Sequence, residues 1–131
     1  MRARKTPPKE FTIDRAEWVN GGRDPDKSGE SGLLNPEDNA CCLGFYANAC
    51  GVPWDKLFNM DTPRELLTTR RITLPLMLDE HKCTSYFARL CMDINDESSL
   101  CAKERERQLR AAFKEHDVKI KFVGRYPKDA S

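Results

Sequence analysis

The stretch from Asn39 to Cys50 constrains the fold of this chain more than any other part of the sequence. It reads Asn-Ala-Cys-Cys-Leu-Gly-Phe-Tyr-Ala-Asn-Ala-Cys, and Gly51 follows it, where a glycine commonly ends a helix. As a helix, the stretch is apolar on nearly every side, and such a helix is normally buried on nearly every side. We therefore expect it to be the central core element. Asn35 and Pro36 offer an earlier capping residue and first helical position, so its start stays open.

Other segments have the spacing of amphipathic or capped helices. The clearest begins at Cys83, because apolar residues follow it at offsets 3, 4, 7, 8 and 11, up to Ile94. Capping residues and apolar spacing predict four further helices: one from Asp14 through Trp18, one over 53–58, one from Thr62 with Pro63 in its first turn, and one over 100–116.

Short alternating or extended runs predict strands at 11–13, 72–74, 76–78 and 118–122. Pro75 separates two of them, and a proline suits an edge strand or a bend. Together the elements predict an α+β fold, with a small antiparallel sheet of about three to four short strands packed with about four to five helices, one of them buried at the centre.

Length and composition fit a single domain. The chain has 131 residues, of which 39% are hydrophobic and 33% charged, a globular rather than a disordered composition. We expect a flexible basic arm over 1–10, one globular domain over 11–124 and a polar tail over 125–131. Residues 21–32 are rich in Gly, Asp and Ser and predict a mobile surface loop.

The sequence favours neither export nor a membrane. No apolar stretch follows the basic residues at the amino terminus, and the longest uncharged run, 39–54, is too short and too interrupted to span a bilayer. We therefore expect a cytoplasmic protein with no membrane contact. Its six cysteines are then reduced thiols that pack as small hydrophobic side chains.

Charge is unevenly distributed although the net charge is only +1. Residues 1–10 carry +3, residues 11–102 carry −6 and residues 103–128 carry +5. The basic ends could contact nucleic acid or an acidic partner, although a solvated helix of mixed charge has the same composition. The candidate binding residues are the terminal cations and two central acids: Arg105, Arg107, Arg110, Lys114, Lys119, Lys121, Asp55 and Asp61.

A helix-turn-helix over 43–60 is one alternative. Ala47, Gly51, Val52 and Leu57 fall at the spacing that such motifs use. The second helix, however, carries only Lys56 as a cation and lies in the acidic part of the chain, where phosphate is repelled. An ordinary helical corner of the core explains the same spacing.

A thiol-dependent hydrolase or deamidase is another alternative, because helix starts activate thiols and a histidine can serve as base. The residues concerned are Cys41 and Cys42 as nucleophiles, His81 and His116 as bases, and Asn95 and Asp96 as orienting groups. Neither histidine has a local motif around it, and Cys42 belongs to the apolar face. Structural packing explains the thiols equally well, and the sequence favours a protein that is not an enzyme.

Metal and cofactor signals are weak. The spacing of a calcium loop is met by Asp93, Asn95, Glu97 and Glu104, but Ser98 stands where the sharp turn asks for glycine. Capping of the next helix by Asp96, Ser98 or Ser99 explains the same residues without a metal. Zinc-ligand spacing and glycine-rich phosphate loops are both missing from the sequence, so we expect no cofactor.

Three short motifs carry a resemblance: Cys41-Cys42-Leu43-Gly44-Phe45, then Ile94-Asn95-Asp96, then Arg105-Glu106-x-x-Leu109 with Phe113, His116 and Phe122-Val123. Through them, most of 11–123 resembles small bacteriophage and prophage proteins without an established activity. The resemblance implies a phage origin and a host-cytoplasmic setting, and it transfers no catalytic residue. Short non-enzymatic phage proteins often bind and block host machinery. We therefore expect a phage accessory protein that binds a host defence or replication factor, with nucleic acid as a less favoured partner.

Overall fold

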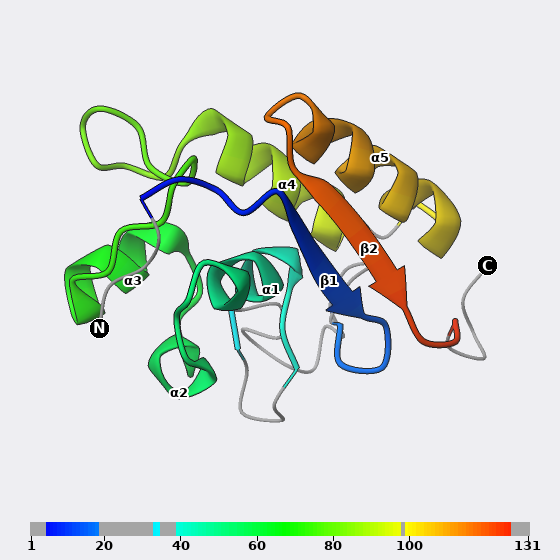
Figure 1. Cartoon of the computed structure of the whole chain (residues 1–131), viewed down its shortest axis with the longest axis horizontal. Coiled ribbons are helices and arrows are strands. Elements are labelled where there is room, and N and C mark those ends of the chain that lie inside the picture. The colour runs from blue at the N-terminus through cyan, green and yellow to red at the C-terminus, as the bar shows by residue number, and fades with distance from the viewer. Residues whose placement is uncertain (1–4, 19–32, 35–38, 98, 127–131) are drawn as a thin grey trace.

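The computed structural model describes residues 5–18, 33–34, 39–97 and 99–126. Within these ranges, five helices pack with a sheet of two strands (Figure 1). The elements in chain order are β1 (Glu10–Asp14), α1 (Cys42–Ala49), α2 (Trp54–Leu57), α3 (Pro63–Arg70), α4 (Tyr86–Asp96), α5 (Ala102–Lys114) and β2 (Lys119–Val123). The loop predicted at 21–32, the alternative helix start at 35–36 and Ser98 lie outside the described residues, as do the outer parts of the predicted arm and tail.

The two strands run parallel, so the predicted antiparallel sheet of three to four strands is wrong. Glu10 pairs with Lys119 at one end of the ladder and Asp14 pairs with Val123 at the other. A parallel pair needs a long connection, and here all five helices lie between the strands in sequence. Alternation of apolar and polar side chains predicts a strand but not the direction of the neighbouring strand. The pairing direction could therefore not be predicted from this pattern.

The two strands predicted within 72–78 are also wrong. This segment contains a turn, with Leu76 at a φ of 71°, and an isolated bridge joins Leu78 to Thr84. Met77 is nevertheless fully buried. The apolar residues of this segment therefore mark a turn that packs into the core, because burial alone does not require a strand.

The helix predicted from Asp14 through Trp18 is replaced by a turn. The Asp14 carboxylate accepts a hydrogen bond from the Ala16 N–H at 3.0 Å, and the Asp14 carbonyl accepts one from the Glu17 N–H at 3.0 Å. Trp18 then forms an isolated bridge with Ala40. The aspartate expected to cap a helix thus closes a turn, since its short side chain suits both roles.

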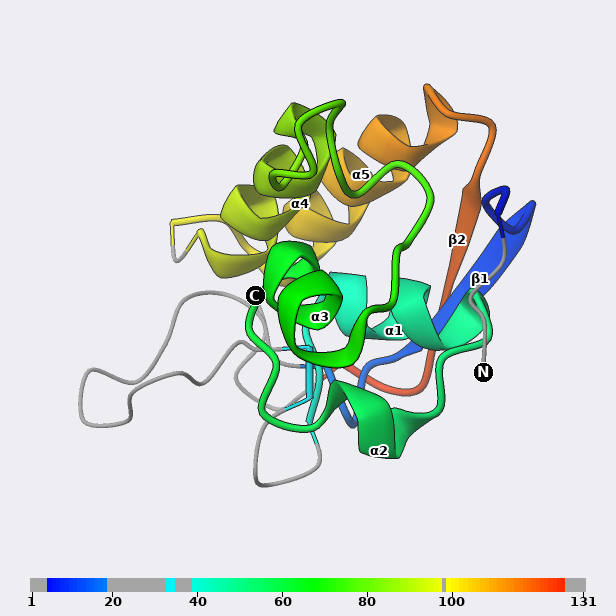
Figure 2. The ribbon, with the colours of Figure 1, turned by 90° about the vertical axis from the view of Figure 1, so that its left-hand side faces the viewer.

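The predicted central helix is confirmed in α1, where residues 42–47 are all buried. It contacts β1, α2 and α4, while α5 packs on both α4 and β2. In both views, α4 and α5 lie on one side of α1 and α2 lies on the other (Figures 1 and 2). Phe11 of β1 meets Tyr46 of α1 and Phe113 of α5 edge to face, with ring centroids 5.6 and 5.1 Å apart. Aromatic contacts thus join the first strand to the last helix.

The amphipathic helix predicted from Cys83 is confirmed as α4 but begins later. The Ser85 side chain caps it by accepting a hydrogen bond from the Ala88 N–H at 3.0 Å. Cys83 therefore precedes the helix and is exposed. The fully buried positions of α4 are Ala88, Cys91 and Asn95. Phe87, Leu90 and Ile94 of the predicted stripe are partly buried against the core, so the core face overlaps that stripe but is shifted around the helix.

For the remaining helices, the structure confirms the predicted positions but only some of the predicted capping residues. The Thr62 hydroxyl accepts a hydrogen bond from the Glu65 N–H at 3.0 Å, with Pro63 in the first turn of α3. The helix predicted over 100–116 is α5, and its N-cap is Cys101, which makes no side-chain capping bond. Asp96 and Ser99 therefore do not cap it, because the connection runs on past both before the helix begins.

Gly44 allows α1 to lie against the segment at Leu33. A Cβ atom added at Gly44 would lie 2.0 Å from the Leu33 carbonyl oxygen and 2.9 Å from the Ala40 Cβ. Only a residue without a side chain fits this approach.

Candidate functional site

The strongest candidate site is a groove at one end of the sheet. Both strands begin at this end (Figure 1). The volume of the groove is about 410 Å³. The described residues that line it come from the residue before β1, the end of α5, the connection that follows α5 and the start of β2. They are Lys9, Arg110, Lys114, Asp117, Val118, Lys119 and Ile120. Four of these carry a positive charge and one carries a negative charge, so we call this site the basic groove.

Backbone hydrogen bonds hold the segments of the basic groove together. The Lys119 N–H donates to the Lys9 carbonyl at 2.9 Å, which ties the start of β2 to the residue before β1. Asp117 has a left-handed φ of 61° and turns the chain from α5 into β2. The Val118 N–H then donates to the Phe113 carbonyl at 3.1 Å. The cations from three segments therefore start from fixed backbone positions.

The basic groove combines apolar and charged parts. Val118 and Ile120 are 1% and 3% exposed, whereas Lys114 and Lys119 are exposed. Exposed ammonium groups can bind a carboxylate or a phosphate, and the alkyl stems of the lysines can contact the carbon atoms next to it. The arrangement suits recognition of an anionic group.

Arg110 is the most firmly held cation of the basic groove. Its guanidinium carbon lies 4.9 Å from the centroid of the Phe122 ring, and its Nη2 atom lies 3.4 Å from Glu106 Oε1. Its side chain is still 49% exposed. These two contacts restrict the guanidinium without covering it, so it can contact a ligand at a small cost in side-chain entropy.

Beside the basic groove, Glu106 is the centre of an ion-pair network that the sequence did not predict. Its side chain is 1% exposed and accepts two hydrogen bonds of 2.8 Å from Arg15, and the Tyr126 hydroxyl donates a third at 3.1 Å. The hydrogen bond to Glu106 raises the pKa of Arg15. This bidentate pair fixes the turn after β1 to α5. Its partners are 91 residues apart, so no local pattern could reveal it.

The structure places two of the predicted binding cations in other roles. Arg105 is 3% exposed, and its Nη2 atom donates to the carbonyls of Glu97 at 2.6 Å and Leu100 at 2.7 Å. Burial lowers its pKa. Arg107 is exposed and forms an ion pair with Glu104. Arg105 therefore stabilises the connection between α4 and α5, because its guanidinium group donates hydrogen bonds to carbonyl groups there.

The other three predicted binding residues are exposed but lie away from the basic groove's lining. Lys121 is on β2, Asp55 is on α2 and Asp61 precedes α3. Of the predicted set, the structure thus brings together Arg110, Lys114 and Lys119 at one site. Lys9 is the groove cation that the sequence analysis assigned only to a basic arm.

The thiol alternative loses its geometric support. Cys41 and Cys42 are 2% and 0% exposed. Burial raises the pKa of Cys41 to about 11 and raises that of Cys42 well above its ordinary value. Both histidines are exposed: His81 lies beside Glu80, and the His116 ring lies 4.2 Å from the ring centroid of Phe87. A nucleophile needs access and a lowered pKa, and these thiols have neither.

Asn95, a predicted calcium ligand, has a structural role. It is fully buried in α4, and its Oδ1 atom accepts hydrogen bonds from Trp18 Nε1 at 2.7 Å and from the Cys42 N–H at 3.0 Å. It thus satisfies a free N–H at the start of α1, whose own capping residue, Cys41, makes no side-chain capping bond. Asn95 lies outside the apolar stripe that the sequence displays, so no local signal pointed to this role.

The calcium alternative loses geometric support at its other residues too. Asp93 and Asn95 belong to a helix instead of a loop, Glu97 accepts hydrogen bonds from Ser99, and Glu104 pairs with Arg107. Among the described residues, no group of three or more His, Cys, Asp or Glu side chains could hold a metal ion.

The helix-turn-helix alternative has little geometric support. The second helix, α2, has four residues, which is about one turn and too short to follow a DNA groove. Ala47, Val52 and Leu57 are fully buried, and the Val52 N–H donates to the Ala47 carbonyl at 3.2 Å. The spacing therefore reflects a packed helical corner.

None of the helices in the described parts of the chain is long and apolar enough to cross a membrane. Comparisons with models of protein families, with curated proteins and with solved structures find no match to this chain. Its function is therefore argued from the site itself.

Proposed function

We propose that this chain is a phage accessory protein that acts by protein–protein contact in the host cytoplasm, and that its basic groove binds an acidic segment of a host protein. The target class is a host defence or replication factor, which the bound chain inhibits. The observation that carries the proposal is the convergence of Lys9, Arg110, Lys114 and Lys119 around the buried side chains of Val118 and Ile120.

An acidic protein segment fits this site better than duplex DNA does. The basic groove is one confined hollow with Asp117 in its lining, whereas DNA binding uses cations spread along an extended surface. Other cations of α5 are engaged elsewhere, Arg105 with carbonyl groups and Arg107 with Glu104. The positive charge available to a long polyanion is therefore limited, while a few carboxylates can pair with the groove cations.

The first test measures binding of a fluorescent peptide rich in Asp and Glu. Lys114→Glu and Lys119→Glu should each weaken binding about tenfold, because each replaces an attraction by a repulsion at the groove. Lys121→Glu is the matched control, since Lys121 is exposed on the same strand but outside the lining. Binding should weaken with salt for the wild-type chain.

Two results would contradict the proposal. Equal weakening by Lys121→Glu would show attraction by general charge instead of a site. Tighter binding of a short DNA duplex than of the peptide would favour nucleic acid as the partner. The host target itself is then sought by cross-linking in an infected-cell lysate, where the Lys119→Glu variant should lose the captured protein and the Lys121→Glu variant should retain it.

A further inference from the structure

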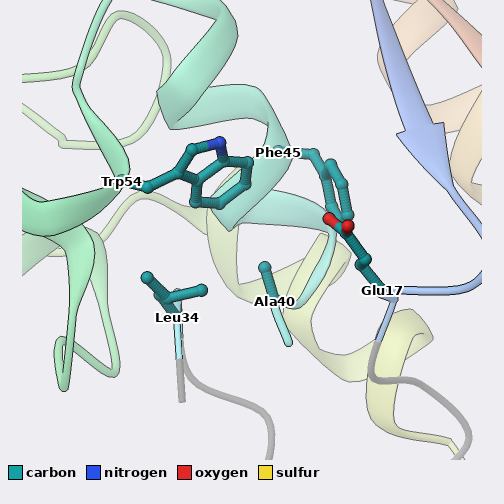
Figure 3. A pocket seen from close by; sticks show the side chains of 5 residues that line it. All are labelled: Glu17, Leu34, Ala40, Phe45 and Trp54. Atoms are coloured by element: carbon teal, nitrogen blue, oxygen red, sulfur yellow. The ribbon is translucent and has the colours of Figure 1, made fainter. Parts of the chain in front are cut away.

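A second hollow lies beyond the other end of β1. The basic groove begins at Lys9, just before β1, whereas this second site includes Glu17, three residues after β1 ends. Its volume is about 230 Å³. Figure 3 shows the five side chains that line it, Glu17, Leu34, Ala40, Phe45 and Trp54, converging from separate segments of the chain. We call it the aromatic pocket.

Two aromatic rings form a corner of the aromatic pocket. Phe45 of α1 and Trp54 of α2 have ring centroids 5.5 Å apart and planes at 82°. Phe45 is 6% exposed and Trp54 is partly exposed, so one ring is fixed in the core and the other borders solvent. The corner arises because α1 and α2 pack against each other across the short turn between them.

The opposite side of the aromatic pocket is held by backbone contacts. The Ala40 N–H donates to the Glu17 carbonyl at 2.9 Å, and the bridge between Trp18 and Ala40 extends this pairing. Glu17 therefore begins from a fixed backbone position, while its side chain is exposed. Among the described residues that line the pocket, Glu17 alone carries a charge.

We propose that the aromatic pocket binds an organic cation, the ammonium or guanidinium group of a lysine or arginine side chain presented by a protein partner. The face of a Trp ring attracts cations, Trp54 is the ring that borders solvent, and the Glu17 carboxylate supplies a full negative charge. Leu34 and Ala40 offer apolar contact to the alkyl part of such a side chain.

Other ligand classes fit less well. An anion would be repelled by Glu17, and an inorganic cation such as Ca²⁺ needs six or more oxygen ligands, where the described lining of the pocket supplies one carboxylate. A neutral apolar group would gain nothing from the charge of the Glu17 carboxylate. The inference does not rest on the basic groove, because the two sites have no described lining residue in common.

The test titrates the intact chain with small probes while the two indole N–H signals are followed by NMR. The probes are n-butylammonium, n-butylguanidinium and choline, with 3,3-dimethyl-1-butanol as the neutral counterpart of choline. The cations should shift the Trp54 signal and leave the buried Trp18 signal nearly unchanged. Choline should bind at least about threefold more tightly than its neutral counterpart. A preference between the ammonium and guanidinium probes tells lysine from arginine.

Variants separate charge from shape. Glu17→Gln keeps the size of the side chain and should weaken cation binding at least about threefold without changing binding of the neutral probe. Trp54→Leu should abolish the binding of all the cations, followed in this variant by the backbone amide signals of Glu17 and Ala40, because the Trp54 indole signal is lost. Glu10→Gln is the matched control, because Glu10 is an exposed carboxylate on β1 outside the pocket, and it should leave binding unchanged.

Three outcomes would overturn the proposal. Equal binding of choline and its neutral counterpart would show that the pocket binds ligands by apolar contact alone. Unchanged cation binding in Glu17→Gln, with the fold intact by circular dichroism, would remove the role of the carboxylate. No shift of Trp54 by any probe would show that the pocket is not a binding site. None of these outcomes bears on the peptide experiment at the basic groove.

Discussion

At the residue scale, two buried polar side chains connect parts of the chain that no local pattern relates. Asn95 hydrogen-bonds Trp18, 77 residues away, and Glu106 pairs with Arg15, 91 residues away. Buried polar groups stabilise a fold only when they form hydrogen bonds. Removing one partner leaves the other buried without a hydrogen bond, which costs the full free energy of its desolvation. Both residues are therefore positions where a small change should have a large effect on folding.

Asn95→Ala should lower the free energy of unfolding by about 2–4 kcal/mol, because the Trp18 indole N–H and the Cys42 N–H lose their common acceptor inside the core. Asp93→Ala, at an exposed position of the same helix, should change it by less than about 0.5 kcal/mol. Urea unfolding followed by fluorescence measures both. Equal effects of the two substitutions would show that Asn95 matters only through helix propensity.

The thiols divide into two accessible and four buried groups. In the native chain, Cys83 and Cys101 should react rapidly with a water-soluble disulfide reagent, while Cys41, Cys42, Cys50 and Cys91 react only as the protein opens. All six should react rapidly in denaturant. Rapid native reaction of Cys41 or Cys42, identified by mass spectrometry, would return the thiol-enzyme hypothesis to consideration.

Alkaline pH should destabilise the fold through the same buried thiols. Burial raises the pKa of Cys41 from 9.0 to about 11, so the folded state binds its proton more tightly than the unfolded state does. This contribution to stability is complete below about pH 9 and is lost as the pH rises toward 11. Denaturant midpoints at several pH values measure it. A Cys41→Ala variant should show a shallower alkaline decline.

At the element scale, helix ends and apolar periodicity decided where helices form, but not which side of each helix faces the core. The capping residue Thr62 and the alternation in β2 were sufficient to place those elements. The face of α4 was predicted less well, because its buried positions include Asn95, a polar residue, while Tyr86, an apolar one, is 75% exposed. Side-chain contacts with α1 determine which face of α4 is buried. That face coincides only in part with the most hydrophobic face of the helix.

Gly44→Ala tests the close approach of α1 to the Leu33 carbonyl. Alanine favours a helix over glycine by about 1 kcal/mol, so local propensity alone predicts stabilisation. The Cβ atom that alanine adds would, however, overlap the Leu33 carbonyl oxygen. We therefore expect a net loss of about 1–3 kcal/mol in unfolding free energy through overpacking. The reverse exchange Ala111→Gly, at an exposed position of α5, calibrates propensity by itself. Stabilisation by Gly44→Ala would contradict the packing described here.

At the scale of the whole molecule, the first and last described elements form the sheet, and the helices occupy the chain between them. Aromatic contacts of Phe11 with Tyr46 and Phe113 join β1 to α1 and α5. The two candidate sites depend on this closure, because each includes a segment next to β1 that is held by distant backbone groups. Binding is thus linked to the integrity of the sheet.

Phe11→Ala should cost about 3–5 kcal/mol in unfolding free energy, as removal of a fully packed aromatic ring usually does. Thr12→Ala, its exposed neighbour on the same strand, should cost less than about 1 kcal/mol. Hydrogen exchange should show the amides of β1 and β2 losing protection together in Phe11→Ala, since each strand has only the other as its described partner. Independent loss of protection would contradict the parallel pairing.

By itself, the sequence determined what acts over a few residues. The apolar stretch at 39–50 predicted the buried central helix, Thr62 and Pro63 predicted the start of α3, and alternation predicted both strands. Caps and periodicities involve neighbours in the chain, so a single sequence displays them directly. Contacts between residues far apart in the chain were not predicted.

Only the tertiary structure decided the direction of strand pairing, the partners of Asn95 and Glu106 and the composition of the two candidate sites. Lys9 meets Lys119, and Glu17 meets Ala40, through backbone hydrogen bonds that any residue type can form. Such contacts leave no mark in the local pattern of residue types. The basic groove and the aromatic pocket are therefore products of chain closure, which brings together charges and rings that the sequence keeps apart.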